Sequence, residues 1–223
     1  YIQTGVPFVT LKFALTLDGR IATATGNSRW ISSPASLRFA HRLRRSHDAI
    51  LVGAGTVRED DPELTCRLVR GKNPLRIVVD SLLRSAPEAR LFDQKQARTI
   101  IATTAAAPRK RRRLFEERGV EVLELGADEA GRVDLPGLLI RLGKKNIASL
   151  LVEGGAGVNT SFLRSGLADR LVAVVAPKIV GAGIDAVGDL GIREMAQALQ
   201  LSFERVVRSG DDLIIDTRFT RRR

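Results

Sequence analysis

The sequence contains few of the residues that build metal centres and disulfides. Among its 223 residues are one cysteine, Cys66, and two histidines, His41 and His47. One cysteine excludes an internal disulfide and a zinc site of several cysteines, and two histidines leave little material for a histidine metal centre. We therefore expect a metal-free protein of the cytoplasm in which Cys66 is inert.

Long uncharged runs and aromatic residues are also scarce. The longest stretch without a charged residue is Tyr1–Leu11, which is too short to span a membrane, so no membrane partner is expected. Aromatic residues make up 4% of the chain, and none is interleaved with the basic run Arg109–Arg113. Without stacking side chains, that run does not favour a nucleic-acid partner.

Positive charge, in contrast, is plentiful. The net charge is +11, and eight of the positive charges lie in Arg109–Arg113 and Arg221–Arg223. A strongly basic chain favours nucleic acid, an anionic membrane or phosphorylated small molecules as partners. Because acidic residues follow the first run closely, we expect that run to form a solvated helix face. Small phosphorylated molecules are then the favoured partners.

Apolar runs typical of β-strands alternate with segments typical of helices. The expected strands are Pro7–Leu17, Ala49–Val52, Leu75–Val79, Thr99–Ala102, Val120–Leu125, Ala148–Val152 and Leu171–Ala176, with a closing hairpin of Phe203–Arg208 and Leu213–Phe219. The expected helices are Pro34–Arg45, capped by Ser33, and Arg109–Arg118, Pro136–Gly143 and Gly157–Arg164. This alternation predicts an α/β fold with a largely parallel sheet and an antiparallel edge. We expect one domain, residues 1–223, with a linker-like start at 1–6 and a tail at 220–223.

Four of the expected strands run directly into small or hydroxylated residues. These strand ends are Gly53–Thr56, Asp80-Ser81, Thr103-Thr104 and Glu153–Gly157. In a parallel sheet such ends share one edge, where open α/β proteins bind ligands. Glycine lets backbone N–H groups approach a phosphate, and a following helix N-terminus favours an anion. No Walker lysine follows either glycine run, so a P-loop nucleotidase is not expected.

Several charged or aromatic side chains are candidates for binding, and each has a plainer alternative. Arg44, Arg45 and Arg67 are candidate phosphate clamps or ordinary solvated arginines. Glu153 ends a strand beside a glycine loop, where a surface ion pair is the alternative. Trp30 belongs either to a core or to a stacking surface. Neither histidine has a serine–acid arrangement around it, so hydrolase chemistry gains no support.

The motifs are more informative in their order along the chain. They are Thr10-Leu11-Lys12-x-Ala14, Thr16-Leu17-Asp18-Gly19-Arg20, Gly26-x-Ser28-x-Trp30-Ile31, Val52-Gly53-x-Gly55-Thr56-Val57, Asp60-Asp61-Pro62-x-Leu64-Thr65-x-Arg67, Val79-Asp80-Ser81, Val152-Glu153-Gly154-Gly155 and Ala176-Pro177-Lys178. Taken together, they resemble the reductase domain of the bifunctional pyrimidine deaminase–reductase of riboflavin biosynthesis. The resemblance covers nearly the whole chain. The deaminase motifs His-x-Glu and Pro-Cys-x-x-Cys are absent from the sequence, and the chain begins at Tyr1, so we expect a fragment of, or a neighbour to, a deaminase-bearing protein.

The resemblance implies a dihydrofolate-reductase-like fold, a homodimer and an NADPH-dependent reduction. The expected substrate is 5-amino-6-(5-phosphoribosylamino)uracil, whose ribosyl group becomes ribityl. By matching position, the residues expected to contact NADPH are Ala14, Trp30, Thr56, Asp60, Ser81, Gly155, Ala156, Gly157, Val158, Asn159, Thr160 and Ser161. Those expected to contact substrate are Ser28, Arg44, Leu64, Arg67 and Glu153. Asp60 and Lys12 are the candidates for proton transfer, and we add the hypothesis that Arg84 reaches the 2′-phosphate of NADPH.

Three alternatives remain open from the sequence. The substrate could be the undeaminated 2,5-diamino-6-ribosylaminopyrimidinone 5′-phosphate, or the chain could be another NADPH reductase of the same superfamily. A true dihydrofolate reductase is disfavoured, because the first helix, Pro34–Arg45, offers no Asp or Glu to bind a pterin. A nucleic-acid-binding module is the least favoured reading, and it would show affinity that falls steeply with salt.

Overall fold

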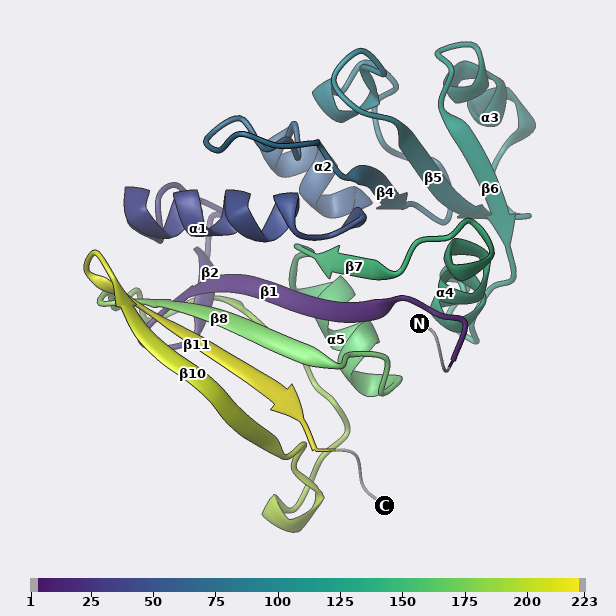
Figure 1. The fold of residues 1–223 in the computed structure, drawn as a ribbon. Coiled ribbons are helices and arrows are strands. Elements are labelled where there is room, and N and C mark those ends of the chain that lie inside the picture. Colours follow the sequence, from purple (N-terminus) through teal and green to yellow (C-terminus); the bar gives the residue numbers. More distant parts are fainter. Residues whose placement is uncertain (1–3, 221–223) are drawn as a thin grey trace. The chain divides into compact units, whose positions relative to one another are not determined.

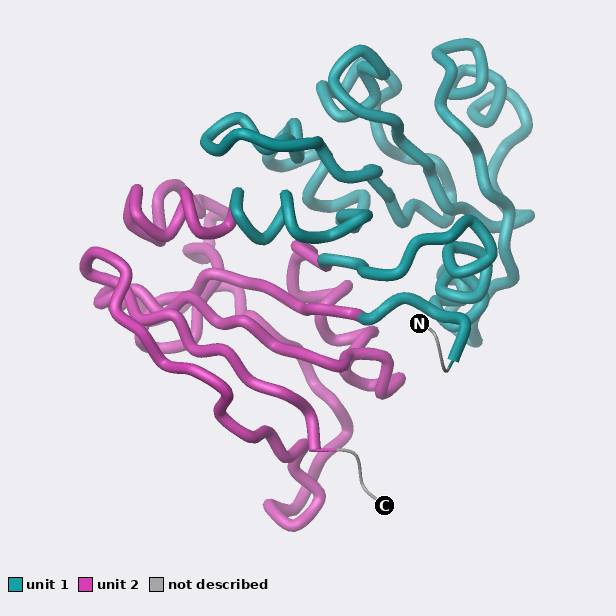
Figure 2. Tube along the Cα trace, in the orientation of Figure 1, with its two compact units in different colours: residues 1–8, 41–151 teal, residues 9–40, 152–223 magenta. Residues whose placement is uncertain are grey.

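The computed structural model describes residues 4–220. Residues 1–3 and 221–223, which hold part of the expected linker-like start and of the tail, lie outside the described residues. The contacts divide the chain into two compact units, shown in Figure 2: unit 1 is Tyr1–Phe8 with His41–Leu151, and unit 2 is Val9–Ala40 with Val152–Arg223. Each unit therefore combines two separate stretches of sequence. The single-domain expectation stays a prediction.

Unit 1 contains a parallel sheet. Its strands β3 (Ala49–Gly53), β4 (Leu75–Val79), β5 (Thr99–Thr104) and β6 (Glu121–Leu125) pair in that order, and β7 (Ser149–Val152) lies next to β3 in the strand order. Every residue of β3 and β5 is buried, as expected for parallel strands covered on both faces. The helices of this unit are α2 (Ala54–Asp60), α3 (Arg109–Glu116) and α4 (Leu135–Lys144), labelled in Figure 1, with a short 3-10 turn at Arg90–Phe92.

Unit 2 contains a mixed sheet and a small two-stranded sheet. Strand β1 (Phe8–Thr16) pairs parallel with β8 (Arg170–Ala176), β8 pairs antiparallel with β11 (Asp212–Phe219), and β11 closes a hairpin with β10 (Leu201–Ser209). The small sheet pairs β2 (Arg20–Thr23) with β9 (Gly183–Asp185), and the unit also holds α5 (Ala156–Arg164) and a 3-10 turn at Met195–Gln197. Leu11 of β1, Val172 and Val174 of β8, and Phe162 of α5 are each buried.

Helix α1 (Pro34–Arg45) begins in unit 2 and ends in unit 1. The expected cap is present: Ser33 Oγ accepts a hydrogen bond from the backbone N–H of Ser36 at 3.4 Å. Proline at the first helical position fits this start, because its missing N–H has no partner to lose there.

The expected secondary structure is confirmed, with small differences at the ends. Each predicted strand and helix is present within a few residues, as are the largely parallel arrangement and the C-terminal hairpin. The short elements α2, β2 and β9 were not expected, and neither were the two 3-10 turns. The small residues after β3 belong to helix α2, which begins at Ala54 with Gly53 as its N-cap, and Gly55 needs no positive φ there.

The expectation that the basic run Arg109–Arg113 forms a solvated helix face is only partly confirmed. Arg109, Lys110 and Arg113 are exposed, as expected for a solvated face. Arg111 and Arg112 are half-buried instead. Arg111 Nε donates to the carbonyl of Leu83 at 2.8 Å, and Arg112 pairs with Glu124. Two of the five charges therefore hold unit 1 together.

Candidate functional site

The residues singled out by the sequence fall into both units. Unit 1 holds Arg44, Thr56, Asp60, Leu64, Arg67 and Ser81, whereas unit 2 holds Lys12, Ala14, Ser28, Trp30, Glu153 and residues 155–161. Among the described residues, no group of three or more His, Cys, Asp and Glu side chains could hold a metal ion.

The carboxyl ends of β3, β4 and β5 meet at one edge of the unit 1 sheet. Gly53 lies opposite Val79, and Val79 opposite Ala102, so the residues that follow these strands are neighbours. The carbonyl of Ser81 accepts hydrogen bonds from the hydroxyls of Thr103 and Thr104, each at 3.0 Å. The sequence prediction that these strand ends share an edge is therefore confirmed for three strands.

The turn after β4 presents Arg84 to solvent. The buried carboxylate of Asp80 accepts hydrogen bonds from both the N–H and the hydroxyl of Ser85, each at 2.7 Å. Leu83, between them, has a φ of 52° and is buried, while Arg84 is exposed. The side chain of Ser81 accepts from the N–H of Val133 at 3.1 Å, an interaction that leaves its hydroxyl hydrogen available to an acceptor.

Two candidate phosphate clamps come together in unit 1. Arg44 Nη1 donates to the carbonyl of Thr65 at 3.3 Å, and Arg67 Nη1 lies 3.3 Å from Glu63 Oε2. Partial burial and the positive charge of Arg44 lower the pKa of Arg67. Leu64 is only 2% exposed, with a φ of 54°, so it can offer little more than its edge to a ligand. Arg44 of α1 and Arg67 of the segment after α2 thus place two positive charges close together.

A buried arginine that the sequence did not indicate holds the loop that carries Glu63 and Arg67 from the interior of unit 1. Arg76, in β4, is fully buried, and its guanidinium donates to the hydroxyl of Thr99 at 2.9 Å and to the carbonyls of Asp93 at 2.7 Å and Glu63 at 3.3 Å. Burial lowers its pKa from the usual value of an arginine to about 10, so it stays charged at neutral pH. The signal available in the sequence was a single charge inside the apolar run Leu75–Val79.

Helix α2 carries two further candidates. Thr56 in its first turn and Asp60 at its end are both half-buried. The helix ends at Asp61, whose φ is 40° and whose N–H donates to the carbonyl of Val57 at 3.2 Å. Asp61 Oδ1 in turn accepts from the N–H of Arg90 at 2.8 Å. The two acidic residues before Pro62 therefore have different roles: Asp61 is the C-cap of the helix, and Asp60 is half-buried in its last turn.

In unit 2, strand β1 presents Lys12 and Ala14 on one face. Both are half-buried, and they lie opposite Val172 and Val174 of β8. Because side chains two apart on a strand share a face, the two residues are suited to act on the same ligand.

The segment around Ser28 and Trp30 is exposed but anchored. The Trp30 side chain belongs to a residue that is 64% exposed, which favours the stacking interpretation over the core one. Its carbonyl accepts a hydrogen bond from Lys178 Nζ at 2.5 Å. Lys178 belongs to the Ala176-Pro177-Lys178 motif, and the sequence offered no role for it. Ser28 is half-buried, and its carbonyl accepts from Ile31 N at 3.2 Å.

Asp18 fixes the loop that carries Lys178. Its carboxylate accepts hydrogen bonds from the hydroxyl of Thr16 at 2.6 Å and from the N–H of Gly181 at 2.7 Å. These bonds, led by that of Thr16, lower the pKa of Asp18 below its usual value of 3.8. The turn pair Asp18-Gly19 thus acts as an anchor as well as a turn.

The glycine loop of unit 2 leads into α5. Glu153 and Gly155 are half-buried, and Gly157 is exposed. A Cβ on Gly154 would lie 2.6 Å from Val158, whereas a Cβ on Gly157 would meet nothing within 4 Å. Gly155 is the N-cap and provides no side-chain hydrogen bond to the first turn. This helix start is therefore bare and positively polarised, which suits an anion.

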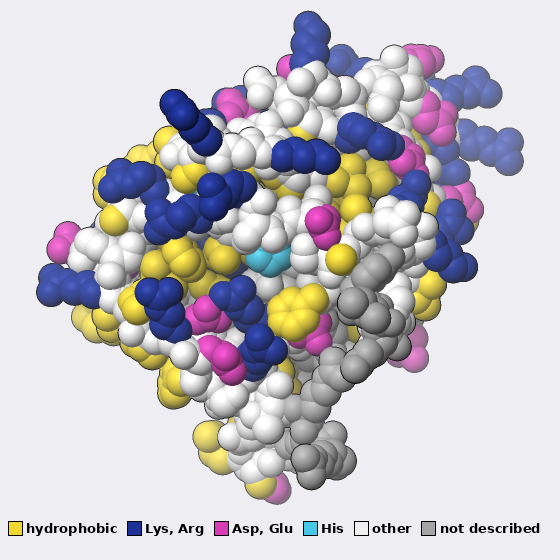
Figure 3. Space-filling view, in the orientation of Figure 1, with side chains coloured by type: hydrophobic (Ala, Val, Ile, Leu, Met, Phe, Trp, Pro, Cys, Tyr) yellow, Lys and Arg dark blue, Asp and Glu magenta, His cyan; other side chains and the backbone are white. Residues whose placement is uncertain are grey.

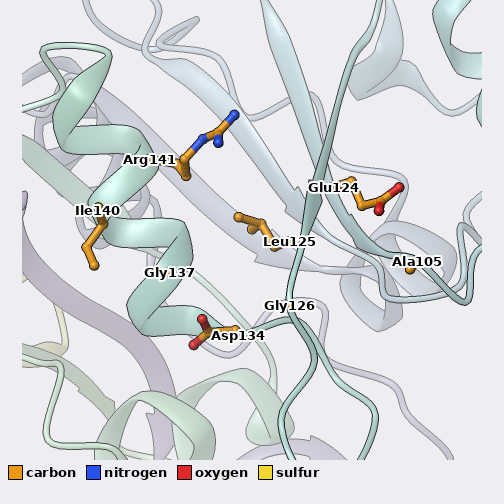
Figure 4. Close-up of a pocket in the computed structure, with 8 residues that line it drawn as sticks. All are labelled: Ala105, Glu124, Leu125, Gly126, Asp134, Gly137, Ile140 and Arg141. Atoms are coloured by element: carbon orange, nitrogen blue, oxygen red, sulfur yellow. The ribbon is translucent and has the colours of Figure 1, made fainter.

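An open hollow of about 600 Å³ lies elsewhere in unit 1, by α4 and the end of β6. In Figure 4, Leu125 points towards α4 while Glu124 points to the opposite side of the strand. Asp134, Ile140 and Arg141 also line it. None of its lining residues is among the candidates from the sequence.

The surface and the helices bear on the class of partner. On the face shown in Figure 3, Lys and Arg side chains are spread out with Asp and Glu among them, and they do not form a single basic stripe. Within residues 4–220, no helix has the length and apolar character that crossing a membrane requires.

Comparisons with known proteins agree with these motifs. The family model for the RibD C-terminal domain matches residues 7–215. Riboflavin biosynthesis protein RibD of Aquifex aeolicus is 42% identical over 216 residues, which are 96% of this chain and 58% of that protein. The 2,5-diamino-6-ribosylamino-4(3H)-pyrimidinone 5′-phosphate reductase of Methanothermobacter thermautotrophicus is 45% identical over 216 residues, which are 94% of this chain and 97% of that protein. The chain thus spans little more than half of the RibD relative.

Solved structures give the same result. The deaminase/5-amino-6-(5-phosphoribosylamino)uracil reductase of Thermotoga maritima is 34% identical and has a TM-score of 0.80, with 99% of this chain and 58% of that one covered. The dihydrofolate reductase of Enterococcus faecalis, at 12% identity and a TM-score of 0.56 over 96% of this chain and 97% of its own, shows the fold alone. The expected dihydrofolate-reductase-like fold is confirmed, and the chain belongs to the RibD C-terminal domain family.

Proposed function

We propose that the chain reduces the ribosyl group of 5-amino-6-(5-phosphoribosylamino)uracil to the ribityl group, with NADPH as reductant. The observation that carries this proposal is the family match over residues 7–215. Relatives whose names include this reductase activity or riboflavin biosynthesis support it.

The donor groups of the chain suit a phosphorylated nicotinamide cofactor. The start of α5 offers backbone N–H groups without a side-chain cap, and open space at Gly157 would let a pyrophosphate approach the helix. We assign Ala14, Trp30, Thr56, Asp60, Ser81 and residues 155–161 to this cofactor, with Arg84 facing its 2′-phosphate. The cofactor would supply the hydride that is added to C1′ of the ribose.

Arginine chemistry suits the 5′-phosphate of the substrate. Arg44 and Arg67 lie close enough for their charges to repel, so a dianion bound to both would relieve that repulsion. In the other unit, Ser28 would contribute a hydroxyl, and the half-buried carboxylate of Glu153 would accept hydrogen bonds from pyrimidine amino groups. Leu64 is assigned to an apolar contact at the edge of the same loop as Arg67.

Proton transfer is assigned to Lys12 and Asp60. Opening the ribose breaks the bond between C1′ and the ring oxygen, which must gain a proton, while the glycosidic nitrogen forms a double bond to C1′ as it loses its own. After hydride addition to C1′ the nitrogen gains a proton. Lys12 on β1 and Asp60 at the end of α2 are half-buried groups able to donate or accept at these atoms.

The undeaminated substrate is the second candidate. It is favoured by one observation: the Methanothermobacter relative that is covered over 97% of its length is named for the pyrimidinone form. The two substrates differ at a single ring position, so the proteins that use them need differ by only a few contacts.

The test is turnover with both substrates. The purified chain is incubated with NADPH or NADH and with either pyrimidine ribosylamine phosphate, and loss of nicotinamide absorbance is followed. We expect turnover with NADPH and the uracil form. Turnover with the pyrimidinone form alone would replace the first candidate by the second, and no turnover with either would reject the function while leaving the fold intact.

We also propose that the chain forms a homodimer and works with a deaminase, either fused to it or separate. The deaminase proposal rests on the RibD relatives, of which this chain covers 58%. Light scattering of the purified chain tests the first part, and a single subunit mass across a concentration series would reject it.

A further inference from the structure

Residues 183–191, here called the strap, lie along α5 in unit 2. Three side chains of α5 bond to the strap's backbone. Asn159 Nδ2 donates to the carbonyl of Ala186 at 3.0 Å, Thr160 Oγ1 accepts from the N–H of Gly188 at 2.7 Å, and Arg164 donates to the carbonyl of Asp189. The strap is thus fastened to the helix by side chains that recognise its main chain.

The side-chain N–H₂ group of Asn159 carries its structural role. The residue has no exposed surface, and its Oδ1 is buried without a hydrogen-bond partner among the described residues. A buried acceptor without a partner costs free energy, so the amide is retained for what its N–H₂ group does, which is to hold Ala186. A ligand could not touch this side chain unless the segment moved.

Thr160 acts in the same way. Its hydroxyl donates to the carbonyl of Ala156 at 2.6 Å while accepting from Gly188. Both hydrogen-bonding roles of the hydroxyl are therefore engaged within unit 2. A Cβ on Gly188 would lie 3.3 Å from Thr160 Oγ1, so the absence of a side chain at Gly188 allows the close approach.

The other side of the strap is fastened to β2 and to the turn before it. Strand β9 pairs with β2 in the register Ala22 with Ile184 and Thr23 with Gly183, and the N–H of Ala186 donates to the carbonyl of Gly19 at 3.2 Å. Thr23 N–H donates to the carbonyl of Asn27 at 2.9 Å. The segment that carries Trp30 therefore continues from a strand that the strap holds. Figure 1 labels α5 and β2, the two elements joined in this way.

We propose that Asn159 and Thr160 are positioning residues: through the strap they couple the start of α5 to the segment around Trp30. The inference deepens the proposed function, because both ends of this connection are assigned to the cofactor. Both residues belong to the segment 155–161 that is assigned to the cofactor; we assign their backbone to the cofactor and their side chains to the strap.

The experiment uses Trp30, which is the only tryptophan of the chain, as a reporter that needs no cofactor. In Thr160→Val the hydroxyl is lost at nearly constant volume, and Thr160→Ser restores it. Asn159→Ala removes the amide, and Ser165→Ala, at the exposed end of the same helix, is the matched control. Backbone amide exchange in 183–191 and quenching of Trp30 fluorescence by acrylamide are measured for each folded variant.

We expect amide exchange in the strap to rise about fivefold in Thr160→Val, the factor that loss of one ordinary hydrogen bond brings, and Trp30 quenching to rise with it. Thr160→Ser and Ser165→Ala should match the parent chain. Faster exchange with unchanged Trp30 quenching would overturn the coupling, as would an equal effect in Ser165→Ala or no change at all. If Asn159→Ala fails to fold, Thr160→Val decides alone.

Cofactor binding separates this inference from the proposed function. NADPH affinity is measured by titration, and we expect it to be about fivefold weaker in Thr160→Val, by the same factor. If the parent chain does not bind NADPH, the proposed function fails, but amide exchange and Trp30 quenching still decide whether the strap couples the two segments.

Discussion

Replacing Arg76 with methionine tests whether the loop that carries Arg67 is held from inside unit 1. The guanidinium donates to the hydroxyl of Thr99, to the carbonyls of Asp93 and Glu63, and to that of Ala97. Methionine retains much of the side-chain volume but has no donor. Four oxygen atoms would lose their partner.

The cost follows from what the substitution leaves behind. Three of the four acceptors are main-chain carbonyls, which cannot be removed together with the arginine, so the substitution differs from exchanging a whole buried ion pair for apolar residues, which can be neutral. Each buried acceptor left unsatisfied costs about 1–3 kcal/mol, and partial access to water reduces the sum. We expect a loss of about 3–5 kcal/mol, a large share of the roughly 5–15 kcal/mol that stabilises a typical fold.

The assay is urea unfolding of Arg76→Met, with Arg98→Met as the control. Arg98 has a side chain that is 81% exposed, so its loss should change the free energy of unfolding by less than about 0.5 kcal/mol. Arg76→Lys keeps the charge and fewer hydrogen bonds, so it should fall between the two. Equal stability of Arg76→Met and Arg98→Met would refute the reasoning.

The pH dependence gives a second check. Burial lowers the pKa of Arg76 from its usual value to about 10, so the unfolded chain binds this proton more tightly than the native one. The stability contributed by Arg76 therefore changes only as the pH rises from about 10 towards the ordinary pKa of arginine, and over that window it increases. The difference between Arg76→Met and the parent should stay constant from about pH 6 to about pH 9.

Three further predictions concern single side chains. Arg67→Met should raise the KM for the phosphorylated substrate at least about tenfold and change kcat less, because it removes a charge-assisted bond; steady-state kinetics measure this, and an unchanged KM would contradict it. Arg84→Ala should weaken NADPH binding about tenfold and leave NADH binding unchanged, as measured by titration; unchanged NADPH affinity would reject the 2′-phosphate assignment. Asp18→Asn should lower the melting temperature at neutral pH. Because the native pKa of Asp18 is lowered, its contribution is present above about pH 4 and is lost progressively as the pH falls below it. The gap between variant and parent should therefore narrow in acid, and a gap that stays constant as the pH falls would be inconsistent.

Apolar runs predicted most of the fold because burial dictates them. Leu75–Val79 forms β4 with the bounds that the run itself suggests, and its neighbours in the sheet do so nearly as well. The missed elements lack such a pattern. Helix α2 has a single buried residue, Val57, and β2 and β9 have four and three residues, too few for a period to be visible. Their pairing depends on a partner far away in the chain.

Motif order indicates candidate residues for the site but not how they are held in place. Motif order indicated Arg67 and Trp30, and the structure adds Arg76 and Lys178, which bond to the carbonyls of Glu63 and Trp30. A side chain that binds a main-chain carbonyl leaves no residue-specific pattern, because every residue has that carbonyl. Asn159 is the opposite case. Its position suits contact with a ligand, but its side chain hydrogen-bonds to the backbone carbonyl of Ala186.

The arginines explain why net charge alone is a poor indicator of partners. The guanidinium of Arg76 donates to carbonyls inside unit 1, and that of Arg170 in unit 2 forms a bidentate ion pair with Asp216. Neither charge is available to a ligand. Arg44 and Arg67 are a different case, because their two positive charges repel each other. The carboxylate of Glu63 beside Arg67 also pairs with Arg90, so it serves two arginines. A bound dianion would relieve this repulsion, so the local excess of charge, and not the total of +11, supports the proposed phosphate-bearing substrate.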